Sequence, residues 1–101
     1  MRNLGREQLL TELLALRPDL EREGVIHVAL FGSRARGDHR PDSDIDLVIE
    51  VDEKRKFSLL DLIGVGHIVE DSIGLPTSLF MRRSLEPGFE TEVQRDGVAI
   101  F

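Results

Sequence analysis

The stretch Ala29–Glu50, with the sequence ALFGSRARGDHRPDSDIDLVIE, contains the features that decide how this chain folds and which chemistry it can support. An apolar run ends in Gly32-Ser33, an arginine-bearing loop follows, and Asp44 and Asp46 open a second apolar run. Residues two apart on a strand project from the same face, roughly 6.5–7 Å apart, so the two carboxylates point the same way. The other face of this strand is apolar, with Ile45, Leu47, Ile49 and Val51. Two carboxylates this close repel each other unless a cation lies between them, and a divalent metal ion is the usual one.

The composition describes one globular domain that spans residues 1–101. Apolar residues make up 41% of the chain and charged residues 32%, which is typical of a globular protein. Its apolar runs are shorter than the ~18 residues that crossing a bilayer requires, so we expect no membrane partner. The N-terminal segment has no signal-peptide pattern, and we therefore expect a cytoplasmic protein.

The cysteine count and the net charge exclude several classes of function. The chain has no cysteine, which excludes disulfides, thiolate zinc sites and cysteine nucleophiles. Its net charge of -6 argues against strong nucleic-acid binding, because such binding depends on Lys and Arg neutralising phosphates. An anionic ligand would therefore need local positive groups.

Periodicity predicts the elements around this stretch. A leucine-rich helix is expected over 3–16, with Asn3 as a possible cap, a bend at Pro18, and a short turn over 19–23 that Gly24 stops. The run at 25–31 predicts a strand that is buried on both faces. Further along, the pattern predicts a helix at 58–72, a strand at 77–81, a helix from Pro87 to near Gly97, and a short strand in the tail at 98–101.

The loop after Gly32 can provide groups that bind an anion. Ser33 is a natural N-cap for a short helix through Arg36, and a helix N-terminus presents free N–H groups to an anion. Arg34, Arg36 and Arg40 add positive charge, and the planar guanidinium suits phosphate oxygens. Ordinary turn geometry and surface solvation would account for the same residue types. We assign no role to His27, His39 or His67.

The combined pattern resembles that of a known family. A buried strand ends in Gly32-Ser33, ten residues intervene, and Asp44-x-Asp46 begins the next strand. This G-S, ten residues, D-x-D signature is similar to that of the minimal nucleotidyltransferase (MNT) group of the DNA-polymerase-β-like superfamily. The resemblance extends through the leucine helix, the KFSLLDL segment at 56–62 and the RRSLEPG segment at 82–88. It implies an α/β (α+β) nucleotidyltransferase fold, with a small mixed sheet of three to four strands flanked by helices.

The resemblance also implies an activity and roles for residues. It implies transfer of a nucleoside monophosphate, with AMP from ATP as the expected group, to a hydroxyl with the help of two Mg²⁺ ions. Gly32 and Ser33 would contact the triphosphate, Asp44 and Asp46 would hold the metals, and Arg34 or Arg36 would neutralise the leaving pyrophosphate.

The chain departs from the family pattern at one position. The superfamily normally has a third carboxylate on the strand after the long helix, and here the segment TSLFM at 77–81 places Ser78 there. A serine neither carries the charge nor accepts a proton from an attacking hydroxyl at neutral pH. The second metal would therefore bind more weakly. Glu50 is too far along its strand to be an equivalent substitute, and Glu70 and Asp71 are further candidates.

Two functions from different classes follow from the resemblance. MNT proteins often act as antitoxins that modify a tyrosine of a small helical HEPN ribonuclease, which would be the partner of an active enzyme. The alternative is a catalytically weak or inactive MNT domain that neutralises the HEPN partner by binding.

The D-x-D pair also occurs in two further enzyme classes and as a purely structural feature. A haloacid-dehalogenase-type phosphatase wants a hydroxyl shortly after its second aspartate, where this chain has Leu47 and Val48. D-x-D glycosyltransferases are usually much larger. A purely structural pair of aspartates at the start of a strand is the third alternative.

Overall fold

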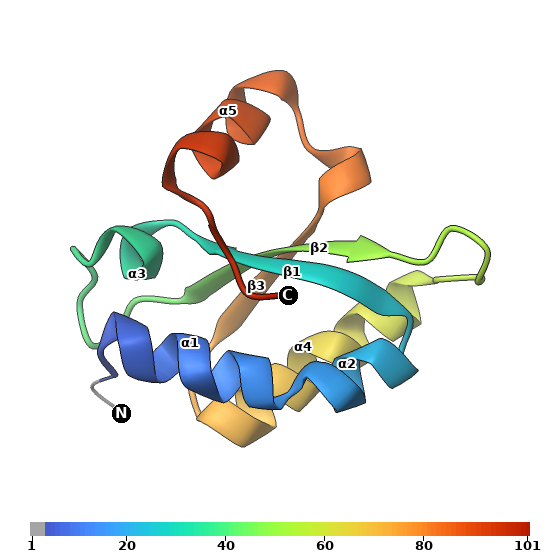
Figure 1. The fold of residues 1–101 in the computed structure, drawn as a ribbon, viewed down its shortest axis with the longest axis horizontal. Helices are drawn as coiled ribbons and strands as arrows, with labels where there is room; N and C mark the ends of the chain where they lie inside the picture. The colour runs from blue at the N-terminus through green and yellow to red at the C-terminus, as the bar shows by residue number, and fades with distance from the viewer. Residues whose placement is uncertain (1–3) are drawn as a thin grey trace.

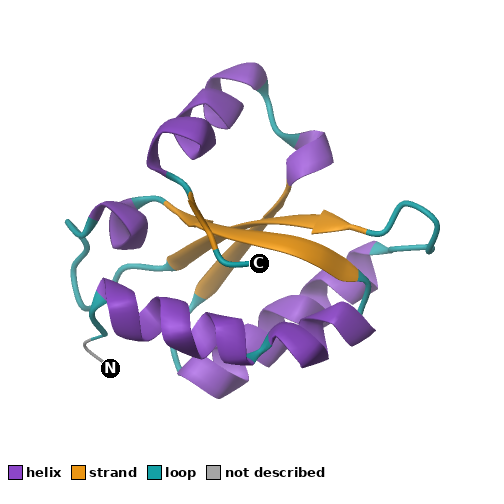
Figure 2. Cartoon of the chain, in the orientation of Figure 1, coloured by secondary structure: helices purple, strands orange, loops and turns teal. Residues whose placement is uncertain are grey.

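The computed structural model describes residues 4–101, which form helices on both sides of a small sheet (Figure 2). In chain order the elements are α1 (Arg6–Ala15), α2 (Arg17–Arg22), β1 (Val25–Phe31), α3 (Ser33–Arg36), β2 (Ile45–Val51), α4 (Leu59–Ile73), β3 (Thr77–Met81), the 3-10 turn η1 (Arg82–Ser84), α5 (Pro87–Asp96) and β4 (Val98–Ala99). Among these described residues, no helix has the length and apolar character needed to cross a membrane.

The sheet has four strands in the order β3-β2-β1-β4. β1 pairs antiparallel with both β2 and β4, whereas β2 and β3 are parallel. A parallel pair needs a long crossover, and α4 provides it. The sheet is therefore mixed, and β2, which begins directly after Asp44, lies between β1 and β3.

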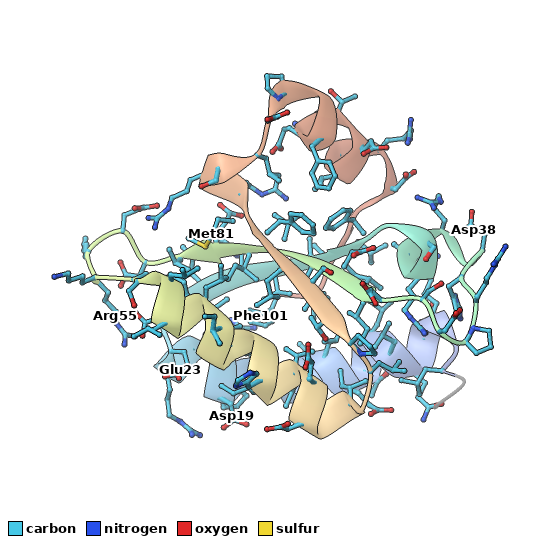
Figure 3. The ribbon with its side chains drawn as sticks, turned by 180° about the vertical axis from the view of Figure 1, so that it is seen from behind. Asp19, Glu23, Asp38, Arg55, Met81 and Phe101 are labelled. Atoms are coloured by element: carbon cyan, nitrogen blue, oxygen red, sulfur yellow. The ribbon has the colours of Figure 1, made fainter. Side chains whose placement is uncertain are left out.

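Side chains alternate between two apolar layers on the two faces of the sheet. The larger layer joins Ile45, Leu47, Ile49 and Val51 of β2 to buried residues of α1, α2 and α4. On the other face, Phe31, Val48 and Val93 form a smaller cluster, against which Phe80, Leu85 and Phe89 pack. Figure 1 shows α1, α2 and α4 on one side of the sheet and α5 on the other. Seen from behind, side chains fill the space between α5 and the sheet (Figure 3).

The first helical region is divided in two. α1 ends at Ala15 and α2 begins at Arg17, with Pro18 in the first turn of α2, where its missing N–H costs least. The bend expected at Pro18 is thus confirmed, but it falls at Leu16, two residues before the proline. The proposed cap Asn3 lies outside the described residues.

The strand predicted at 25–31 is present, but its expected burial on both faces is wrong at its start. Ile26 is 44% exposed and His27 is also exposed. The pairing register shifts between Val25 and His27, and β4 pairs only with Ala29 and Leu30. Neither α5 nor β4 therefore covers the beginning of β1.

The second half of the chain follows the predicted pattern closely. Ser58 caps α4 through a capping box, in which the Asp61 amide donates to Ser58 Oγ at 3.3 Å and the Ser58 amide donates to Asp61 Oδ2 at 2.8 Å. The strand over 77–81 and the helix from Pro87 are both present. The tail contributes β4, which is shorter than the predicted segment.

Candidate active site

The two aspartates lie where the chain enters β2. Asp44 directly precedes the strand and is exposed, and Asp46 is its second residue and half-buried. Because side chains alternate along a strand, both point away from the helical layer that buries Ile45 and Leu47. The two carboxylates therefore share the face that α5 partly covers.

The environment of Asp46 disfavours its negative charge. Burial raises the pKa of the Asp46 carboxyl above its ordinary value, and the nearby charge of Asp44 raises it further. The positive charge of Arg36 acts in the opposite direction and lowers it. An added cation would relieve both unfavourable contributions, as expected of a metal-binding pair.

Gly32 lies directly against Asp46. Phe31, the last residue of β1, pairs in register with Asp46, and Gly32 follows with φ 75° and ψ -158°. A Cβ atom at Gly32 would lie 2.5 Å from Oδ2 of Asp46, closer than such atoms approach. This backbone conformation is essentially restricted to glycine. The Gly-Ser step and the D-x-D pair therefore meet at one end of the sheet.

The structure corrects the expected cap of the short helix. Gly32 occupies the N-cap position, and Ser33 is the first residue of α3. Both Ala35 and Arg36 donate their amides to the Gly32 carbonyl, at 3.1 Å each. The amide of Ser33 therefore comes before the amides that make the first hydrogen bonds within α3. The chain turns beside the aspartates, and the Ser33 side chain does not cap the helix.

Arg34 supports the loop that delivers the aspartates. Its side chain is 1% exposed, and its guanidinium donates to the carbonyls of Ser43 at 3.0 Å and Pro41 at 3.2 Å. Burial lowers the pKa of Arg34, and the charge of Asp44 partly opposes this effect. The geometry favours a structural role for Arg34 over contact with a phosphate.

Arg36 is the arginine that remains near the carboxylates with an accessible side chain. Its guanidinium pairs with Asp38 at 3.1 Å and with Asp96 of α5 at 3.5 Å. Asp38 lies on the turn that follows α3 (Figure 3). The pair with Asp38 is exposed on both sides, so it is weak and can be exchanged for a ligand, whereas the Asp96 side chain is only 14% exposed. The contact with Asp96, which joins α3 to α5, was not foreseen from sequence.

Ser78 stands beside both aspartates. It is opposite Asp46 in the parallel register of β2 and β3, and its hydroxyl donates to Oδ2 of Asp44 at 3.4 Å. Ser78 therefore occupies a place from which a carboxylate could have joined the pair. Within residues 4–101, no group of three or more His, Cys, Asp or Glu side chains is arranged to hold a metal.

The other acids considered as substitutes have different contacts. Glu70 accepts the amide of Thr77 at 3.1 Å, and Glu50 pairs with Arg82 at 3.5 Å. Asp71 is exposed on α4. None of these contacts brings a third carboxylate to Asp44 and Asp46.

The histidines lie apart from this arrangement. His39 contacts the carbonyl of Leu4 through Nε2 at 3.1 Å, His67 is exposed on α4, and His27 stands opposite Glu50 in the sheet. Sequence reasoning also missed the aromatic rings next to the site. Phe80 follows Ser78 by two residues and so shares its face, a signal that the alternation in TSLFM already contained.

The mixed sheet is the one that the sequence resemblance predicts for a nucleotidyltransferase, and comparison with known proteins supports this family. Residues 7–100 match the family model described as the nucleotidyltransferase domain. The protein adenylyltransferase MntA of Thermococcus cleftensis is 35% identical over 101 residues, covering 99% of this chain and all of that protein. The chain belongs to the nucleotidyltransferase domain family.

Solved structures give the same fold. A structure assigned to the minimal nucleotidyltransferases has a TM-score of 0.82 and 30% identity, and covers 97% of this chain and 98% of that one. The complex of a tri-AMPylated HEPN toxin with an MNT antitoxin, from Shewanella oneidensis, has a TM-score of 0.69 and 14% identity. That match covers 95% of this chain and 71% of the other. The nucleotidyltransferase fold expected from the sequence is confirmed.

Proposed function

We propose that the protein transfers AMP from ATP to a hydroxyl of a HEPN-type toxin and acts as its antitoxin. The observation that carries this proposal is the contact between Gly32 and Asp46, with Asp44 on the same face. This contact supports the proposal because Gly32-Ser33, which would bind phosphate, lies next to the carboxylates that would bind the metal. The similarity to MntA supports AMP as the group transferred, and the AMP-modified toxin in the Shewanella complex supports the partner.

The residues present fit magnesium. The donors that meet at the site are two carboxylates and the Ser78 hydroxyl, and Mg²⁺ prefers such oxygen ligands, usually together with substrate phosphates. Asp44 and Asp46 would hold it, and the bound metal would supply positive charge to the triphosphate. With Ser78 in place of a third carboxylate, a second metal would bind more weakly.

The other residues of the site orient and neutralise the substrate. Gly32 leaves room for the Asp46 carboxylate beside the turn, and Ser33 can donate to a phosphate oxygen. Arg36 would exchange its exposed partner Asp38 for the leaving pyrophosphate, while Arg34 holds the loop that positions Asp44. A cytoplasmic location, which the cysteine-free composition favours, completes the proposal.

A tyrosine acceptor must come from another chain. The sequence contains no tyrosine, so the protein cannot modify itself on this residue type. This agrees with an antitoxin that acts on a separate toxin.

Labelled ATP tests the proposal directly. The protein should be mixed with Mg²⁺, ATP carrying a labelled α-phosphate, and the HEPN-type protein encoded beside it. We expect the label to appear on the partner and to require Mg²⁺. Label that never reaches the partner, although the two proteins form a complex, would refute the enzymatic proposal.

The alternative is neutralisation of the toxin by binding alone, and the serine at position 78 favours it. The ribonuclease activity of the HEPN partner distinguishes the two functions. An enzyme should inhibit the partner only when ATP and Mg²⁺ are present, and at amounts well below one antitoxin per toxin. A binding protein should inhibit it without nucleotide and only at stoichiometric amounts.

Ser78→Asp is expected to raise the rate of transfer by roughly tenfold or more, because a positioned base typically contributes 10²–10⁴-fold. The new carboxylate would stand opposite Asp46 and beside Asp44, where it could share a metal and accept the proton of the acceptor. Steady-state transfer at saturating Mg·ATP measures the effect. Ser72→Asp, at an exposed serine of α4, is the matched control. No gain in a folded Ser78→Asp variant would show that the missing acid does not belong at this position.

A further inference from the structure

We infer that the cavity beside Phe80 and Phe89 is the acceptor subsite, which receives the phenol ring of the tyrosine to be modified. This inference rests on the proposed function, because it assigns the acceptor side of that reaction. The cavity has a volume of about 200 Å³ and is lined by Phe80, Ser84, Leu85, Glu86 and Phe89.

The order of the strands decides which side of the site the acceptor uses. β1, which ends in the Gly32-Ser33 turn, and β3, which carries Ser78, flank β2 on opposite sides. In phosphoryl transfer the attacking and leaving oxygens lie roughly in line on opposite sides of the phosphorus. With the pyrophosphate held at the turn after β1, the attacking hydroxyl must approach from the side of β3.

The cavity lies on that side, because Phe80 of β3 lines it. Phe80 is two residues beyond Ser78 on β3, so its ring shares the face of the carboxylates and lies roughly 6.5–7 Å further along. A ring placed against Phe80 could thus direct its hydroxyl back toward Ser78 and Asp44.

Two aromatic rings, of Phe80 and Phe89, line the cavity and pack against a buried third ring. The centroids of Phe80 and Phe89 are 5.1 Å apart, and each lies 5.4 Å from the ring of Phe31, which is only 6% exposed. Aromatic rings held in this way offer edge and face contacts to a further ring. Ser84 and Glu86, which are both exposed, add polar groups to the lining.

The two-carboxylate site independently favours a phenol. A phenol has a pKa of about 10, several units below that of water, so its proton is lost more readily. Ser78 cannot take up that proton, and an acidic hydroxyl reduces the need for a base at this position. An aliphatic hydroxyl would depend much more on the missing carboxylate.

The reaction at this subsite is balanced without a further reactant. The phenol oxygen forms a bond to the α-phosphorus of ATP while the bond from that phosphorus to the α,β-bridging oxygen breaks. Pyrophosphate leaves with the electron pair, and the phenolic proton passes to solvent. The products are an aryl ester of AMP and pyrophosphate.

Ser84→Phe tests the subsite, because it narrows the cavity from an exposed position without removing core residues. Ser72→Phe on α4 is the matched control, since Ser72 is also an exposed serine and lies outside the cavity. The probe is a short synthetic peptide with one tyrosine, compared with the same peptide carrying serine instead. The chain contains no Tyr or Trp, so fluorescence anisotropy of the tyrosine peptide reports its binding without background and without turnover.

We expect Ser84→Phe to weaken binding of the tyrosine peptide at least fivefold and to raise its KM in the transfer reaction. The Kd for Mg·ATP, measured by calorimetry, should stay within twofold, and Ser72→Phe should behave like the unmodified protein. The serine peptide should be a poor acceptor.

The inference would be overturned if Ser84→Phe bound the tyrosine peptide as well as the unmodified protein does, or if the unmodified protein did not bind that peptide at millimolar concentration. It would also be overturned if Ser84→Phe lost as much affinity for Mg·ATP as for the peptide, because the cavity would then belong to the nucleobase. A different result would separate this inference from the proposed function. If the unmodified protein binds the tyrosine peptide and Ser84→Phe weakens that binding, but no AMP is transferred, the cavity still binds tyrosine and only the enzymatic function is refuted.

Discussion

Replacing Asp46 with Asn should reduce AMP transfer by ~10²-fold or more and should also raise the melting temperature of the ligand-free protein. The loss of transfer follows from removing one of the two carboxylates that hold the metal. The gain in stability follows from the raised pKa of Asp46, because burial and Asp44 disfavour its charge in the folded chain. At a pH above the pKa that Asp46 has in the folded chain, the ionised carboxylate lowers the free energy of unfolding. This loss of stability disappears as the pH falls toward 3.8, the ordinary pKa of the group.

Transfer of labelled AMP and thermal unfolding at neutral pH measure the two effects. Asp44→Asn should lose transfer as well, whereas Asp42→Asn, at an exposed position of the same loop, should change neither quantity. Mg·ATP should raise the melting temperature of the unmodified protein and of Asp42→Asn, but not of Asp46→Asn. Label that persists in both Asp44→Asn and Asp46→Asn would refute the assignment of the metal site.

The central geometry of the site could be predicted from sequence because it depends on local spacing. Residues two apart on a strand share a face whatever surrounds them, which placed Asp44 and Asp46 together. The segment TSLFM has the length and composition of a strand, and the parallel pairing with β2 brought Ser78 opposite Asp46. Predicting these features required only the two-residue alternation of side chains along a strand and the order of the elements.

The contacts of the two loop arginines could not be predicted in this way. Arg34 and Arg36 are two residues apart in the same short helix, yet one is 1% exposed and the other lies on the surface. The difference arises because the loop over 37–44 folds back so that its carbonyls surround the Arg34 guanidinium. Composition treats the two arginines alike, and only the path of the loop separates them.

The aromatic cavity was missed for a related reason. Its lining residues all fall within residues 80–89, from β3 through η1 to the start of α5, and only the supporting ring of Phe31 comes from a distant strand, β1. Their assembly depends on α5 returning across the sheet, and the sequence pattern of α5 indicates a helix but not which face it covers.

Gly32→Ala should abolish most of the AMP transfer while the protein still folds. A Cβ atom at this position would lie 2.5 Å from Oδ2 and 3.3 Å from Cγ of Asp46, so the carboxylate or the turn must move. The backbone conformation, with φ 75° and ψ -158°, adds strain of about 1–3 kcal/mol for any residue with a side chain. Displacing Asp46 would change both the metal site and the turn that holds the triphosphate, so Mg·ATP binding should weaken together with transfer.

Gly37→Ala separates these two causes, because Gly37 also has a positive φ, 88°, but a Cβ atom there would have nothing within 4 Å. Chemical denaturation should show that both variants lose stability, Gly37→Ala by about 1 kcal/mol and Gly32→Ala by more. Calorimetry and the labelling assay should then show near-normal Mg·ATP binding and transfer in Gly37→Ala alone. If both folded variants lost transfer equally, backbone strain near α3 would account for the effect. If only Gly32→Ala loses it, the reason for glycine at position 32 is the space that the Asp46 carboxylate occupies.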